Sequence, residues 1–223
     1  MTDVRGPKPG RTTAACQPPA QIPPQVSRVV SIGARARPPE PAVSEETRLH
    51  QAFLGRVIDF LCADTGVTQF IDWGCPVPGT AERVRAARAD ARFVHVAPQG
   101  AAGMLSSSDT AVITGDGSGD GALTRRLTTS GLVDFDEPVA VLMTRPFTAD
   151  DPPAEIAALH ALMRGGGYLA LTSTAPRRTV ERAFRPFRPI EPGVADLTWW
   201  PYPDEDVCAQ GTGILGGLGR RQR

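Results

Sequence analysis

The segment PVAVLMT, residues 138–144, decides the fold class of this 223-residue chain. It is almost continuously apolar, whereas a strand with one face in water alternates apolar and polar residues. Such a run predicts a strand buried on both faces, at the centre of a parallel sheet. Because crossover helices join parallel strands, the segment should be flanked by alternating helices and strands.

That alternation runs outward in both directions. Pro152-Pro153 opens a helix that Gly165-Gly166-Gly167 stops. Ser44 is expected to cap the first helix and Gly66 to end it. Thr80 is expected to cap the next helix. The predicted strands are 68–72, 92–97, 111–114, 138–144 and 168–172, and the predicted helices are 44–66, 81–89, 122–129, 152–163 and 177–184, with a weak helical patch at 101–105.

The last two predicted strands, 196–200 and 212–218, have no helix between them, so they should form a hairpin. The chain is therefore predicted to be an α/β protein with a seven-stranded, mostly parallel sheet, an antiparallel last strand, and helices on both faces. Trp199 and Trp200 are adjacent, so one is expected to pack on the core and the other to line a substrate cleft.

The composition argues against several classes of protein. The chain has 24 basic and 24 acidic residues and no formal net charge, so nothing global draws it to nucleic acid or to anionic membranes. Its longest apolar runs are far shorter than the ~20 residues that span a bilayer. The four cysteines are widely spaced, without zinc-ligand or disulfide patterning. We expect a cytoplasmic protein with reduced thiols and no signal peptide.

Residues 1–43 differ in composition from the rest of the chain. They are rich in Pro, Arg, Ala and Gln, and they bury too little apolar surface to offset the entropy of ordering. We therefore expect residues 1–43 to be a disordered tail and residues 44–223 to form one domain.

Loops after the predicted strands carry the candidate ligand-binding residues, because ligands of open α/β sheets bind beyond the carboxyl ends of the strands. Gly74 would let the backbone approach a ligand, and Asp72 would accept hydrogen bonds from one or else bond loop amides. Asp116 is placed to accept from the exocyclic amine of a base, or simply to form a turn. Arg145 follows the central strand, either flanking a transferred group or as a surface charge.

Several other signals are missing. Ala97 ends the second strand, where a nucleoside site usually has an acid for the ribose hydroxyls. His50, His95 and His160 lack metal-ligand spacing, so core or helix-surface roles are expected for them. GxSxG, Walker A and GxGxxG motifs do not occur, and an NAD-dependent oxidoreductase therefore fits poorly.

From about residue 48 to residue 220, the chain resembles a family of S-adenosylmethionine (SAM)-dependent methyltransferases common in high-GC bacteria, formerly a domain of unknown function. The family pattern RAFLxRAVRFLxxxAGIxQFLDIGTGLPT is similar to QAFLGRVIDFL at 51–61 and GVTQFIDWG at 66–74. Further matches, in the same order, lie at 132–142, 150–152, 166–169, 191–194 and 216–220. The resemblance implies a Rossmann-like class I methyltransferase fold and SAM as cofactor. The positions at which it implies cofactor binding are Asp72, Gly74 and Asp116.

The chain resembles a divergent member of that family. Pro76 stands where the family has its second loop glycine, which removes an N–H donor. The strand-two acid falls on Ala-Pro-Gln at 97–99, and the Ser-His after strand five reads Ser173-Thr174. The family's Leu-Gly-Gly-Lys-Asp-Asn motif is missing, and the Pro-rich tail stands in its place.

Two hypotheses follow from this resemblance and its departures. The chain is a SAM-dependent methyltransferase with a small-molecule acceptor and weakened cofactor binding, or it is an inactive descendant that binds a protein partner, for example through its tail. Neither hypothesis involves nucleic acid or a membrane.

Overall fold

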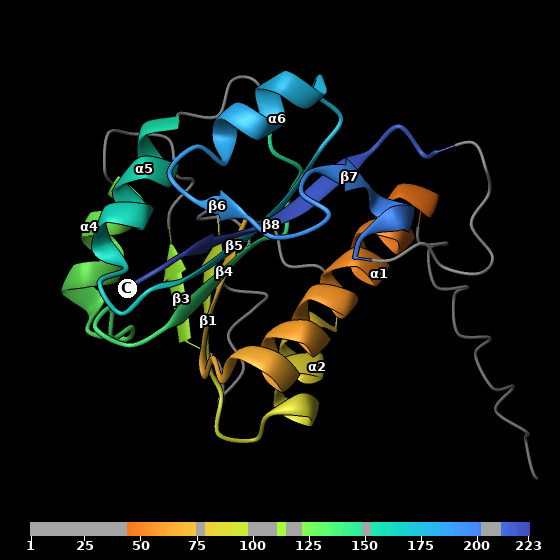
Figure 1. Cartoon of the computed structure of the whole chain (residues 1–223). Coiled ribbons are helices and arrows are strands. Elements are labelled where there is room, and N and C mark those ends of the chain that lie inside the picture. The colour runs from red at the N-terminus through yellow and green to blue at the C-terminus, as the bar shows by residue number, and fades with distance from the viewer. Residues whose placement is uncertain (1–43, 75–78, 98–110, 115–121, 149–152, 202–210) are drawn as a thin grey trace, which may run out of the picture. The chain divides into compact units, whose positions relative to one another are not determined.

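The computed structural model describes residues 44–74, 79–97, 111–114, 122–148, 153–201 and 211–223. The predicted disorder of residues 1–43 and the predicted helical patch at 101–105 lie outside the described residues. Within them, helices cover both faces of a mixed sheet (Figure 1), so the predicted α/β class is confirmed.

The sheet has eight strands in the order β3-β2-β1-β4-β5-β8-β6, with β7 also paired to β8. The strands are β1 Gln69–Trp73, β2 Arg92–Ala97, β3 Ala111–Thr114, β4 Val139–Met143, β5 Gly167–Ser173, β6 Arg188–Pro189, β7 Ala195–Asp196 and β8 Leu215–Arg221. Neighbours among β1 to β5 pair in parallel, and β8 runs antiparallel to β5 as predicted. The strand order reverses between β1 and β4, which makes their carboxyl ends the topological switch point of the sheet.

The predicted strand at 196–200 is wrong. The chain forms a short 3₁₀ turn, η2, at Leu197–Trp199, because the Asp196 carboxylate accepts a hydrogen bond from the Thr198 N–H at 3.2 Å and caps that turn. Two strands of two residues each, β6 and β7, therefore pair with β8 where one longer strand was expected. Trp200 is buried in the core, as expected for one of the pair, and Trp199 is 43% exposed.

Helices α1 and α2 cover one face of the sheet, and α4, α5 and α6 cover the other (Figure 1). They are α1 Glu45–Phe60 with its π-helical extension η1 Leu61–Thr65, α2 Thr80–Ala87, α4 Ala122–Ser130, α5 Pro153–Leu162 and α6 Arg177–Ala183. Ser44 caps α1, its hydroxyl accepting from the Thr47 N–H at 3.1 Å, and Gly66 ends η1 with φ +69°, both as predicted. Thr80, predicted as a cap, is instead the first residue of α2 and is buried, and Gly79 is the N-cap.

Alternation along the strands separates two apolar layers. Ile71 and Val141 pack toward α4 and α5, whereas Phe70 and Ala140 pack toward α1. By the same alternation, the next side chains on the α1 side come from the carboxyl ends of the strands and lie close together. Those residues are polar, and they build the candidate site.

Candidate functional site

Five polar side chains gather where β1, β2, β4 and β5 end, on the face that α1 covers. All five are at most 7% exposed. They are Asp72 of β1, His95 of β2, Thr144 directly after β4, Thr172 of β5, and His50 of α1. A buried polar group is stable only when it is hydrogen-bonded, so the contacts within this cluster decide what it can do.

Asp72 is the centre of the cluster. One carboxylate oxygen lies 2.7 Å from Nδ1 of His95, and the other accepts a hydrogen bond from the Thr144 hydroxyl. The His95 ring packs edge-on against Phe93, with ring centroids 4.9 Å apart. An ionised Asp72 only accepts, so His95 holds a proton on Nδ1 in this contact. The protein itself thus occupies both carboxylate oxygens, and Asp72 links β1 to β2 and to β4.

His50 brings α1 into the same cluster. Its Nε2 lies 3.3 Å from the Thr172 hydroxyl on β5. Burial lowers the pKa of His50, although a hydrogen bond with the Met143 backbone and the charges of Glu46 and Asp72 act in the opposite direction. Burial thus favours the neutral form of the His50 imidazole.

Gly74 forms the turn that follows β1. Its N–H donates to the Val96 carbonyl at 3.1 Å, while the Trp73 carbonyl accepts from the Thr144 N–H at 3.2 Å. Gly74 has φ +137°, and a Cβ atom there would lie 2.8 Å from Cγ of Arg145. The position needs glycine because another part of the chain packs against it. The sequence predicted close approach by a ligand; the approach seen in the structure is made by Arg145.

The segment after β4 is held against β5. The Phe147 N–H donates to the Thr172 carbonyl at 2.6 Å, and the Ser173 hydroxyl donates to the Phe147 carbonyl at 2.6 Å. Phe147 is buried in the core on the α4–α6 side. These contacts fix the half-buried Arg145 between the ends of β1 and β5.

Two of the three predicted cofactor positions, Asp72 and Gly74, thus lie together at the switch point. Asp116 lies outside the described residues, as do Pro76 and the rest of residues 75–78, 98–110, 115–121 and 149–152. Ala97 is fully buried and pairs with Thr114 of β3, so the position that lacks the ribose acid ends its strand as expected.

Sequence reasoning missed the partners of Asp72. It assigned His50 and His95 to core or helix-surface roles, and their burial confirms the first of these roles. It placed Thr144 in the segment 144–147, expected to flank the transferred group, and it attached no role to Thr172. The one available signal was that Thr144 and Thr172 lie at the predicted ends of strands, and parallel register brings strand ends together.

Among the described residues, no three His, Cys, Asp or Glu side chains are grouped so as to hold a metal ion. In the same part of the chain, no helix combines the length and the apolar character that crossing a bilayer requires.

Comparison with known proteins is informative at the level of family and fold. The family model described as S-adenosyl methyltransferase matches residues 29–185. A solved structure from Thermobifida fusca, assigned as a methyltransferase, is 25% identical over 80% of this chain and 82% of its own, with a TM-score of 0.64. A DUF574 family protein from Streptomyces avermitilis is 19% identical over 78% of this chain and 83% of its own, with a TM-score of 0.57. No curated protein matches the sequence.

Proposed function

This chain belongs to the S-adenosyl methyltransferase family, and we propose that it transfers a methyl group from SAM to a small-molecule acceptor. The observation that carries the proposal is the end of β1, Asp72-Trp73-Gly74, at the switch point between β1 and β4. When bound, SAM supplies an electrophilic methyl group on a sulfonium, and the protein supplies binding and orientation. The balanced charge of the chain favours a small acceptor over nucleic acid.

Asp72 and Gly74 would support cofactor binding chiefly by shaping the carboxyl edge of the sheet, and less by direct hydrogen bonds to the cofactor. Both Asp72 oxygens and the Gly74 N–H already have partners within the protein. A buried carboxylate at this edge still favours a cationic ligand, because its charge is poorly screened there. Its role is thus to position the ends of β1, β2 and β4 and to set the sign of the local field. Asp116 would accept from the exocyclic amine of adenine.

Ala97 is the reason to expect weak binding. An acid at the end of β2 would accept hydrogen bonds from the ribose hydroxyls, and its loss weakens binding by about ten- to a hundredfold. This position also motivates the second candidate function, an inactive descendant that keeps the fold to bind a protein partner. The two candidates differ in whether SAM binds at all.

Calorimetric titration of the full chain with SAM tests the proposal. We expect saturable binding, weakened at least tenfold by Asp116→Ala. Absence of heat at millimolar SAM would contradict the proposal and favour the inactive descendant.

Restoring the missing acid sharpens the test. Ala97→Asp should strengthen SAM binding, and Gln99→Asp serves as a second variant because Ala97 is fully buried and an acid there could destabilise the fold. Ala87→Asp, on the exposed end of α2, is the matched control for added charge. Equal strengthening by the control would show that net charge, and not a ribose contact, is responsible.

A further inference from the structure

A second candidate site lies at the opposite edge of the sheet. A pocket of about 350 Å³ opens where β5 begins and β8 ends. Its lining includes Arg220, Arg221, Arg223, Tyr168 and the glycines 165–167. The volume lies within the range of about 300–1,000 Å³ that small-ligand sites occupy. Methyl transfer makes no use of these residues.

The pocket is separate from the switch point. Arg221 pairs with Gly167 and Arg220 with Tyr168, at the first two residues of β5. Thr172 and the Asp72 cluster lie toward the other end of the strands. Seven residues of β5 separate the two edges by roughly 20 Å, at about 3.3 Å per residue. A ligand in this pocket would therefore not contact a cofactor at the switch point.

Positive charge converges on the pocket. Three of its lining residues are arginines and none is acidic. Nη1 of Arg221 is buried and has no hydrogen-bond acceptor among the described residues. Burial lowers the pKa of the nearby His160, and the charge of Arg221 lowers it further. An unpaired buried donor and neighbouring like charges are both unfavourable unless an anion is present.

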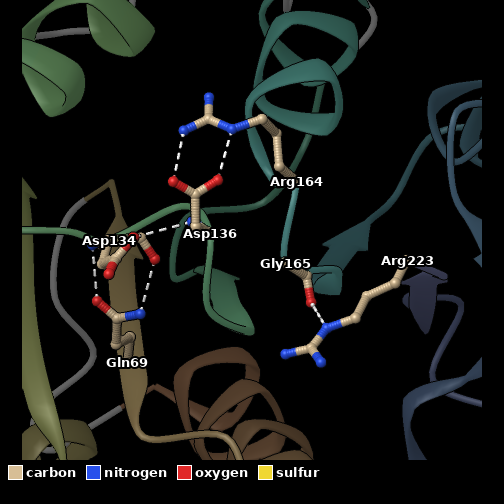
Figure 2. A network of polar contacts seen from close by, with 6 residues as sticks. All are labelled: Gln69, Asp134, Asp136, Arg164, Gly165 and Arg223. Atoms are coloured by element: carbon tan, nitrogen blue, oxygen red, sulfur yellow. Dashed lines mark hydrogen bonds and ion pairs between the residues drawn. The ribbon is translucent and has the colours of Figure 1, made fainter.

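The other two arginines are held beside the opening. The Arg220 guanidinium lies over the Tyr168 ring, 5.9 Å from its centroid. Figure 2 shows the Arg223 guanidinium reaching the Gly165 carbonyl, to which Nε donates at 2.7 Å. Arg164, by contrast, faces Asp136 with two contacts of 2.6 and 3.0 Å and does not line the pocket.

We propose that this pocket binds the phosphate group of a small phosphorylated molecule. Guanidinium groups match phosphate oxygens with paired, charge-assisted hydrogen bonds, and the cluster offers three such groups with no acidic side chain among the described lining residues. A pocket of about 350 Å³ in a chain of zero net charge favours a small ligand over the extended backbone of a nucleic acid.

Titration of the full chain with inorganic pyrophosphate tests the proposal, with potassium chloride at equal ionic strength as the reference. We expect saturable binding by calorimetry that saturating SAM does not displace. No saturation at millimolar pyrophosphate would overturn the proposal, and so would competition with SAM. Displacement of pyrophosphate by a single-stranded oligonucleotide at lower concentration would overturn the assignment to a small molecule.

Variants locate the binding. Arg221→Gln should weaken pyrophosphate binding by about tenfold or more, because it removes a charged hydrogen-bond donor. Arg220→Gln, at an exposed residue, gives the same test without a buried change. Arg178→Gln, exposed on α6 after the other end of β5, alters charge equally and should leave binding unchanged. Equal weakening by Arg178→Gln would overturn the site, and a melting curve of each variant without ligand confirms that it is folded.

Discussion

Polar groups are partnered differently at the carboxyl edge of the sheet, where its parallel strands end, and at the amino edge, where those strands begin. At the carboxyl edge, Asp72, His95 and Thr144 are buried and bonded to one another. At the amino edge, Asp136 and Arg164 pair on the surface, and neighbouring arginines line an open pocket. The carboxyl edge has exchanged water for internal partners, whereas the amino edge keeps the Asp136–Arg164 pair in solvent and leaves Nη1 of Arg221 buried without an acceptor among the described residues.

This difference predicts where a substitution should lower the free energy of unfolding most. Removing one partner from a buried pair leaves the other without water and without a bond, whereas water replaces a lost partner at the surface. Three aspartates differ in their exposure to solvent: Asp72 is 1% exposed, Asp196 is 8% exposed, and Asp136 is on the surface. We expect the cost of substitution to fall in that order, with Gly74 between Asp72 and Asp196.

Asp72→Ala should have the largest effect, a loss of about 4 kcal/mol in the free energy of unfolding, because it breaks a buried pair and leaves two groups without acceptors. Thr144→Val keeps the shape and removes one donor, so it should cost only about 1 kcal/mol. Urea denaturation followed by circular dichroism measures both. A loss below about 1 kcal/mol for Asp72→Ala would show that the cluster is not a bonded unit.

Gly74→Ala should rank next, with a loss of about 2–3 kcal/mol, since the new methyl group meets Arg145 as well as an unfavourable φ. Gly131→Ala is the control, because Gly131 also has a positive φ, +64°, but nothing within 4 Å of the added atom. It should cost about 1 kcal/mol. Equal losses in the two variants would mean that the contact with Arg145 carries no energy.

Asp196 gives an intermediate, pH-dependent effect. Burial raises the pKa of Asp196, but hydrogen bonds from Thr198, Thr212 and Gly213 outweigh burial and lower the pKa. Because the folded value lies below the unfolded value of about 3.9, this stabilisation is complete above that pH and is lost as the pH falls through the folded pKa. Asp196→Asn should lower stability at pH 7 and flatten its decline below about pH 4. Denaturation midpoints at both pH values measure this, and parallel declines in the two proteins would refute it.

Arg164→Gln should have the smallest effect. Its bidentate pair with Asp136 is exposed on both sides, and the hydrogen bond with Arg164 lowers the pKa of Asp136 in open solvent. We expect no change in the denaturation midpoint beyond experimental error, at low or at high salt. A clear loss at low salt would place this pair in a larger charge network with the neighbouring arginines.

Much of the fold follows from local pattern. The predicted strands at 92–97 and 111–114 match β2 and β3 to the residue, because apolar periodicity marks a strand wherever it is buried. The strand predicted at 196–200 failed because the cap formed by Asp196 overrode the β-like composition of the residues after it. Thr80 was misplaced because Gly79, with φ +84°, is the N-cap, so that α2 begins one residue earlier than a hydroxyl cap at Thr80 would place it.

The candidate site was foreseen only in part. Asp72 and Gly74 were predicted from residue type and position after a buried strand, and both lie at the switch point. Their partners are 23 residues away in the case of His95 and 72 residues away in that of Thr144. No local pattern connects residues so far apart, since strand register sets their distance.

By itself, the amino-acid sequence determined the α/β class, the antiparallel last strand and the residues that mark the switch point, because apolar period and strand-end chemistry are local properties. Only the tertiary structure decided that Asp72 is bonded to His95 and Thr144, that Arg145 packs on Gly74, and that arginines from the end of the chain meet the glycines before β5. Those contacts depend on which strands are neighbours and in what register, and that is settled by the packing of the whole sheet.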